Sequence, residues 1–306
     1  MSQSGNRPKM AVGTWAWVFG PYAKAPVPLR EVARAVKEIG YDGVELTGKP
    51  HAHPDGLRTP EERRGLTRLL ADEGLEVASL GGPVGGGSPL AVERGAFLEN
   101  VKRYVELCTD AGIDALRVSS GRPSEPVTRE VGIQRLTDYW GAAAEETGRA
   151  GIRLLWEFEP NQFASRPHDV LRVTDGVGRD SFKVMFDLSH AYVVAVSGIG
   201  VPEAASDAEA HQEGGVPAFA RLLGSRVGRL HIADTDGETM PNGGSKRRRL
   251  GEGKVDFHAT LAALREAGGG QIGDGWWTLD LHGEEDATAV ARESKAFMDR
   301  LAAETA

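Results

Sequence analysis

Four stretches of the chain end in carboxylate or imidazole side chains directly after a run typical of a buried strand. In the clearest of them, KVMFDLSH, the apolar residues Val184 to Phe186 are followed by Asp187 and then His190. The other three stretches end in Glu157 and Glu159, in His231 and Asp234, and in Asp280 and His282. Carboxylate oxygens and neutral imidazole nitrogens are the ligands that bind Mn, Mg, Co or Zn ions. The sequence therefore predicts one divalent metal ion held by the ends of four strands.

The acids of the first two stretches differ in how strongly they indicate a ligand. Side chains alternate along a strand, so Glu157 and Glu159 share a face and either could point into a central site, although only one is expected to bind the ion. Asp187 follows an apolar run, where a free carboxylate is costly unless a cation or hydrogen bonds compensate it. This placement favours Asp187 as a metal ligand.

The remaining two ligands are weaker predictions when each is taken alone. A single His231 is equally compatible with a core histidine, and it becomes a predicted ligand because three acids stand at neighbouring strand ends. Asp280 is the predicted fourth ligand, but it could instead hold a ligand in place or cap the last helix, with His282 as the ligand.

Softer candidates line the same predicted edge. Trp15 and Trp17 could stack on a sugar ring, although one of them should belong to the core. His51 and His53 lie in a polar loop and could enter the pocket or remain in solvent. The basic run Lys246 to Arg249 is most simply a solvated surface, with a phosphate or a partner subunit as the alternative.

Two carboxylates on well separated strands would supply a specific chemistry. Glu157 and Asp280 could lie on opposite faces of a bound sugar, so that one removes a proton from carbon and the other returns it. A divalent ion would bind the carbonyl and the adjacent hydroxyl and stabilise the resulting enediolate. This is the chemistry of isomerases and epimerases of keto sugars.

Strand-like and helix-like segments alternate along the whole chain. The predicted strands are Met10 to Val18, Gly43 to Leu46, Leu75 to Leu80, Ile113 to Ser119, Ile152 to Phe158, Ser181 to Asp187, Val227 to Ala233 and Trp276 to Leu281. An amphipathic segment follows each of them, which implies parallel pairing with helical crossovers. Eight such units favour a closed (β/α)8 TIM barrel forming one domain over residues 1–306, with a flexible N-terminus over residues 1–8. In such a barrel the carboxyl ends of the strands carry the active site.

Composition narrows the possible partners. The chain has 306 residues and a net charge of -8, which argues against nucleic acid or an anionic membrane surface as a partner. It contains a single cysteine and no long apolar run, so we expect a protein of the reducing cytoplasm. The glycine loop, Gly81 to Gly87, lacks the Lys-Ser/Thr pair of a phosphate-binding P-loop. A small carbohydrate or polyol is the expected partner, and a homo-oligomer is left open.

Five motifs resemble the sugar phosphate isomerase/epimerase superfamily, whose xylose isomerase-like TIM barrel also includes endonuclease IV in AP endonuclease family 2. They are GYDGVEL, WEFEP, MFDLSH, LHIAD and LGEGKVDF. The resemblance implies Glu157, Asp187 and His231 as metal ligands, Glu45 and His190 as substrate contacts, and Asp234 as a neighbour of His231 at the substrate site. Trp15 and His53 complete the expected substrate-binding set.

Two departures from the family pattern keep other functions open. The ketose epimerases have Glu where this chain has Asp280, and they carry an Arg shortly after the strand-seven histidine, where this chain reads IADTDG. The shorter acid leaves room for a metal-dependent dehydratase or lyase acting on a keto-inositol, dehydroshikimate or keto-glycoside. Endonuclease IV-like DNA repair and a non-catalytic partner subunit are weaker alternatives.

Overall fold

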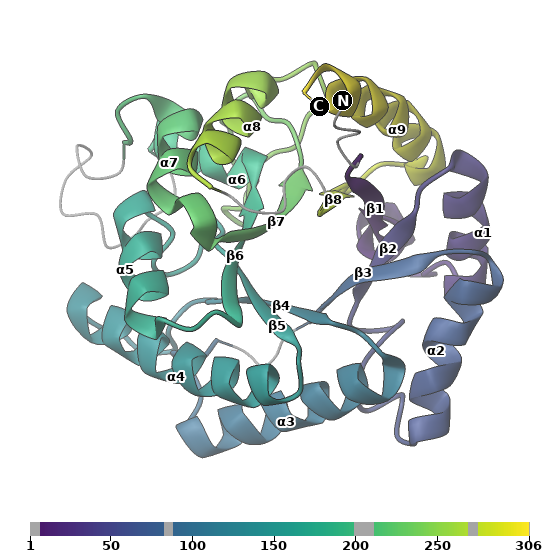
Figure 1. Ribbon diagram of the computed structural model, residues 1–306, viewed down its shortest axis with the longest axis horizontal. Helices are drawn as coiled ribbons and strands as arrows, with labels where there is room; N and C mark the ends of the chain where they lie inside the picture. Colours follow the sequence, from purple (N-terminus) through teal and green to yellow (C-terminus); the bar gives the residue numbers. More distant parts are fainter. Residues whose placement is uncertain (1–6, 83–87, 199–210, 269–274, 306) are drawn as a thin grey trace, which may run out of the picture.

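Eight parallel strands close into a barrel in the computed structural model, which describes residues 7–82, 88–198, 211–268 and 275–305 (Figure 1). Neighbours in the barrel follow the order of the sequence, and β1 pairs with β8 to complete the circle. The strands are β1 Lys9–Gly13, β2 Gly43–Thr47, β3 Glu76–Gly81, β4 Ala115–Ser119, β5 Arg153–Glu157, β6 Phe182–Asp187, β7 Val227–Ile232 and β8 Trp276–Leu279. The predicted (β/α)8 barrel is confirmed.

Helices surround the barrel and return the chain from the end of one strand to the start of the next (Figure 1). The α-helices are α1 Leu29–Ile39, α2 Pro60–Asp72, α3 Arg94–Ala111, α4 Arg129–Arg149, α5 Pro167–Val177, α6 Leu188–Tyr192, α7 Gly215–Leu223, α8 Phe257–Glu266 and α9 Ala287–Glu304. Short 3-10 helices η1 (Thr14–Trp17), η2 (Gly20–Tyr22) and η5 (Gly224–Arg226) and a π-helical turn η3 (Val193–Ser197) complete the described elements. Residues 1–6 of the predicted flexible N-terminus and most of the predicted glycine loop lie outside the described residues.

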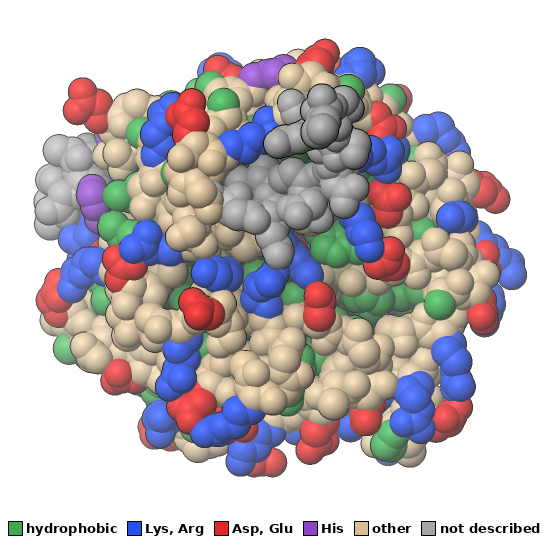
Figure 2. All heavy atoms as spheres, viewed as in Figure 1, with side chains coloured by type: hydrophobic (Ala, Val, Ile, Leu, Met, Phe, Trp, Pro, Cys, Tyr) green, Lys and Arg blue, Asp and Glu red, His purple; other side chains and the backbone are tan. Residues whose placement is uncertain are grey.

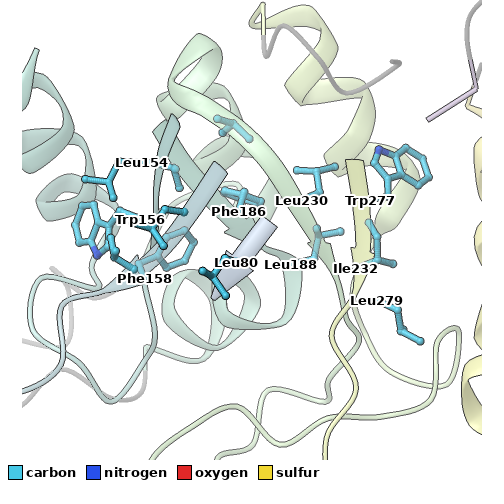
Figure 3. Packing of buried hydrophobic residues seen from close by; sticks show 14 of the residues in the cluster. Leu80, Leu154, Trp156, Phe158, Phe186, Leu188, Leu230, Ile232, Trp277 and Leu279 are labelled. Atoms are coloured by element: carbon cyan, nitrogen blue, oxygen red, sulfur yellow. The ribbon is translucent and has the colours of Figure 1, made fainter. Parts of the chain in front are cut away.

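Side chains alternate along β5 between the apolar layer outside the barrel and the interior of the barrel. Leu154 and Trp156 point outward into the main apolar layer between strands and helices (Figure 3), where Trp156 stacks on Phe182 of β6. Leu155 points inward and packs with residues of β4 and β6 in the barrel interior. Glu157 follows at the same inward face, one step further along the strand. The strand therefore positions this acid at the mouth of the barrel.

The first strand is shorter than its apolar sequence predicts. Residues from Met10 onward were expected to stay extended to Val18, but β1 ends at Gly13 and the chain turns into η1. A Cβ atom at Gly13 would lie 2.1 Å from the ring of Trp15, so only glycine lets that ring fold back over the strand end. This turn brings Trp15 to the barrel mouth.

The surface carries interspersed charges of both signs. On the face shown in Figure 2, basic and acidic side chains alternate and neither forms a dominant patch. No helix within the described residues is long and apolar enough to span a membrane.

Candidate metal centre and its cavity

A cavity of about 420 Å³ opens at the carboxyl ends of the strands. Its walls come from nearly the whole ring of strand ends together with the loop between β7 and α8. The lining residues are Trp15, Phe19, Thr47, Arg117, Glu157, Glu159, Asn161, His190, His231, Met240, Asn242, Gly244, Ser245, Arg247, Asp280 and His282. The sequence placed its predicted ligands at this edge, and the structure gathers most of them around one space.

Four acid and imidazole side chains at the strand ends could hold one ion. Glu157, Asp187, His190 and Asp280 each offer a ligand atom, these atoms lie within 4.8 Å of one another, and all four residues are buried. His231 adjoins this group, because its Nδ1 lies 2.7 Å from Glu157 Oε1 and 3.8 Å from Asp187 Oδ2. The predicted residues Glu157, Asp187, His231 and Asp280 therefore converge, with His190 as an additional donor.

The two carboxylate oxygens of Asp187 have different contacts, one within the backbone of α6 and one at the cluster. It is the last residue of β6 and the N-cap of α6, where Oδ1 accepts a hydrogen bond from the backbone N–H of His190 at 2.7 Å. The other oxygen, Oδ2, faces the centre of the cluster. Burial raises the pKa of Asp187 to about 7. The positive charge of Arg247 lowers this pKa, and the negative charge of Asp280 raises it further.

The two carboxylate oxygens of Asp280 also have different contacts. Trp15 Nε1 donates to Oδ1 at 2.7 Å, and His282 Nε2 lies 3.0 Å from the same oxygen. Burial alone would raise the pKa of Asp280, but the charge of Arg247, aided by His282, holds it well below its usual range. His282 thus contacts Asp280, and Oδ2 of Asp280 accepts from Arg247 at the cluster.

His231 lies between two carboxylates. Its Nδ1 faces Glu157, and its Nε2 lies 3.0 Å from Glu45 Oε2 on β2. Burial opposes the charged imidazole, yet the two carboxylates raise the pKa of His231 well above its ordinary value. When Nε2–H of a neutral His231 donates a hydrogen bond to Glu45, Nδ1 can bind an ion, which is the usual arrangement of a metal-binding histidine and its supporting carboxylate. Glu45 thus contacts the predicted ligand His231.

Two arginines that the sequence reasoning missed lie inside this acidic cluster. Arg117 of β4 donates to Glu45 Oε1 at 2.5 Å and to Glu157 Oε2, and it lies over the ring of Trp15. Arg247, from the β7–α8 loop, donates to both Asp187 and Asp280. The basic run was interpreted as a solvated surface; its neighbours Lys246 and Arg248 are indeed exposed and paired with surface acids, but Arg247 points inward.

Glu159 differs from Glu157 in charge. Burial, followed by the charge of Glu157, raises the pKa of Glu159 to about 8, and Gln162 donates a hydrogen bond to it. Glu157 keeps a pKa below its usual range, because Arg117 and His231 outweigh the effect of burial. A carboxyl with a raised pKa is a weaker ligand, so Glu157 stays the predicted ligand of the two.

The weaker candidates for substrate contacts lie in different parts of the structure. Trp15 lines the cavity, whereas Trp17 donates to Thr288 of α9 at 3.1 Å within the packed layer. His53 lines an adjoining cavity of about 430 Å³ that shares Phe19, Thr47 and Arg117 with the first. Asp234 is buried outside the cavity lining.

Asp234 has a structural task in the β7–α8 loop. Its carboxylate accepts hydrogen bonds from the backbone N–H groups of Thr235, Gly251, Gly253 and Val255 at 2.9 to 3.2 Å. These bonds fix the LGEGKVDF segment against the end of β7. The residue therefore shapes the loop that carries Arg247.

The donor set fits a divalent metal ion. Carboxylate oxygens with one or two imidazole nitrogens suit Mg, Mn, Co or Zn. The carboxylates of the cluster already attract a cation, because the guanidinium of Arg247 lies between Asp187 and Asp280. A buried Glu/Asp/His cluster that already pairs with a cation could bind a metal in its place.

The contact between Glu45 and His231 yields a prediction. Glu45→Gln should weaken Mn²⁺ binding, measured by isothermal titration calorimetry, by about 10-fold, because the amide no longer fixes the histidine tautomer as firmly. Glu76→Gln is the control, since Glu76 is exposed and pairs with Lys9 at the start of β3. Equal affinities for the two variants would show that Glu45 does not support a metal-binding His231.

The family that this fold indicates is also found in the sequence. Residues 33–301 match the family described as the xylose isomerase-like TIM barrel, and the chain belongs to that family. No curated protein gives a significant sequence match.

Several solved structures share this fold. A D-psicose 3-epimerase solved in the presence of D-fructose has a TM-score of 0.70 and 15% identity, with 96% of this chain and 99% of that one covered. The IOLI protein with a bound zinc atom gives 0.72 and 15%, covering 97% and 99%. The probable 3-DHS dehydratase AsbF from Bacillus anthracis gives 0.70 and 16%, covering 95% and 98%. At these identities the similarity establishes the fold.

Proposed function

We propose that this protein is a divalent-metal-dependent isomerase or epimerase of a keto sugar, sugar phosphate or related polyol, acting through an enediolate. The observation that carries the proposal is the convergence of buried ligand atoms from the ends of β5, β6 and β8, with His231 of β7 only 2.7 Å from Glu157. Glu157, Asp187, His231 and Asp280 would hold the ion. When bound, it would supply positive charge beside the substrate carbonyl and so lower the pKa of the adjacent C–H group.

Glu157 and Asp280 are the proposed proton-transferring pair. They extend from β5 and from the end of β8, which lie on nearly opposite sides of the barrel (Figure 1). Each carboxylate is held from behind, Glu157 by Arg117 and Asp280 by Trp15. Fixed carboxylates on two sides of a bound sugar can remove a proton from carbon and return one.

The rest of the cavity suits a small polyhydroxylated molecule. Asn161, Asn242 and His190 offer polar groups for hydroxyls. The ring of Phe19, which is 46% exposed at the rim, stacks on His282 and provides an apolar face of the kind that packs against a sugar ring. Polar groups for orientation beside an aromatic face are typical of carbohydrate pockets.

Metal removal tests this function directly. After dialysis against a chelator, turnover of a panel of ketoses, ketose phosphates and keto-polyols should be lost, and Mn²⁺, Co²⁺ or Mg²⁺ should restore it. The product should have the same mass as the substrate. Full turnover of a panel compound by protein shown by elemental analysis to be free of metal would refute the proposal.

A dehydratase or lyase is the second candidate, favoured by one observation. Asp280 is one methylene shorter than Glu, and its Oδ1 is occupied by Trp15 and His282, so its reach toward the substrate is limited. An enzyme with one well-placed base can still form the same enediolate and then expel a hydroxyl, which leaves as water. Fold similarity to the probable 3-DHS dehydratase is compatible with this chemistry. Loss of one water from the product mass would select this alternative.

A further inference from the structure

Arg247 occupies the position that the cluster offers to an ion. Its Nη2 lies 3.1 Å from Asp187 Oδ2 and also donates to Asp280 Oδ2, while Nη1 donates to Ser189. The side chain is only 10% exposed. One guanidinium group therefore bridges two acids from different strands, β6 and the end of β8.

The bridged oxygens are the ones that a metal ion would need. Oδ1 of Asp187 is used by the backbone N–H of His190, and Oδ1 of Asp280 is used by Trp15 and His282. Each acid thus has Oδ2 directed at the cluster, and Arg247 holds both of these atoms. Two cations at such short separation in a buried site repel strongly. The ion and the guanidinium cannot share this place.

We propose that Arg247 is a positioning residue that holds Asp187 and Asp280 together in the metal-free protein, and that a divalent ion must displace it to bind. The inference rests on the proposed metal-dependent function. Arg247 would then lower the affinity of the site for the metal ion. In exchange, it would keep Asp187 and Asp280 in place when no ion is bound. Without a cation between them, two buried carboxylates on separate strands would repel each other.

The loop allows the side chain to leave without unfolding. Bridges between Asp234 and Arg248 and between Thr239 and Ser245 make this loop a small hairpin. The hairpin backbone is fixed by its own hydrogen bonds, and Arg247 itself lines the open cavity, so rotation of this one side chain into the cavity is sufficient. Arg247 Nε is buried without a hydrogen-bond partner among the described residues, so the present pairing satisfies the guanidinium incompletely.

Arg247→Met tests the proposal, because methionine keeps an unbranched apolar side chain and removes the charge. In chelator the variant should have a lower melting temperature than the wild type. Calorimetric titration with Mn²⁺ should show binding at least about 10-fold tighter than the wild type, equivalent to about 1.4 kcal/mol. Saturating Mn²⁺ should raise the melting temperature more in the variant than in the wild type.

Two control variants separate competition from general effects. Arg248→Met removes the same charge from the neighbouring position, where the arginine pairs with Asp236 at the surface. Arg229→Met removes another buried arginine, which contacts Ala78 and Asp114 near the amino ends of β3 and β4. Arg229→Met should lower the melting temperature, and both controls should keep the wild-type Mn²⁺ affinity.

The outcomes distinguish this inference from the proposed function. If the wild type binds Mn²⁺ and Arg247→Met binds it no more tightly, the inference is overturned and the metal-dependent function stands. If only the variant binds Mn²⁺, competition is supported and the metal-dependent function is not. If neither protein binds the ion, both are overturned.

Discussion

Glu157→Gln is expected to lower turnover by about 1,000-fold, the middle of the range for loss of a positioned acid or base. The carboxylate has two proposed tasks, as a metal ligand and as a base, and its low pKa means that it is charged at neutral pH. The amide can accept a hydrogen bond but cannot take a proton from carbon. Turnover should be measured with saturating Mn²⁺ on whichever panel compound reacts, together with Mn²⁺ affinity by calorimetry.

Glu159→Gln is the matched comparison, two residues further along the chain. Its pKa is raised to about 8, mainly by desolvation and by the charge of Glu157, so the amide is closer to it in charge than to Glu157 and retains an oxygen for Gln162. Mn²⁺ affinity should therefore change little in Glu159→Gln and fall clearly in Glu157→Gln. The reverse pattern would make Glu159 the ligand and would require a different arrangement of the centre.

The barrel and the positions of the acids were predictable because both follow from local patterns. Apolar runs that end in Glu157, Asp187 or Asp280 identify strand ends, and parallel strands bring their carboxyl ends to one edge. Alternation then fixes which side chains face inward, as Leu155 and Glu157 show in β5. Each of these inferences needs only a few neighbouring residues of sequence.

The partners of those acids were not predictable in the same way. Arg247 belongs to a basic run, and the direction of each side chain depends on the hairpin that the loop forms with Asp234. Arg117 gave a weak signal, a charged residue between the apolar Leu116 and Val118, and alternation along that strand could have placed it inside the barrel. Whether Nδ1 of His231 is available depends on Glu45, which is distant in sequence.

Arg117→Met is expected to reduce the free energy of unfolding by about 3 to 5 kcal/mol in the presence of a chelator, the usual cost of removing one partner of a buried ion pair. Glu45 is fully buried, Glu157 nearly so, and both accept a hydrogen bond from this one guanidinium. These two carboxylates keep the pKa of Arg117 above its usual value despite burial. Without Arg117, His231 alone would offset both charges.

Urea unfolding followed by circular dichroism measures this loss as a lower midpoint with an unchanged slope. Arg68→Met is the comparison, since Arg68 and Glu61 form an ion pair on the exposed face of α2 and should contribute nothing measurable. A loss for Arg117→Met as small as for Arg68→Met would mean that the buried carboxylates are neutral or hydrated, and the electrostatic arrangement described for the centre would then be wrong. A large loss would show that Arg117 holds Glu45 and Glu157 charged, the state in which a carboxylate such as Glu157 binds a metal ion.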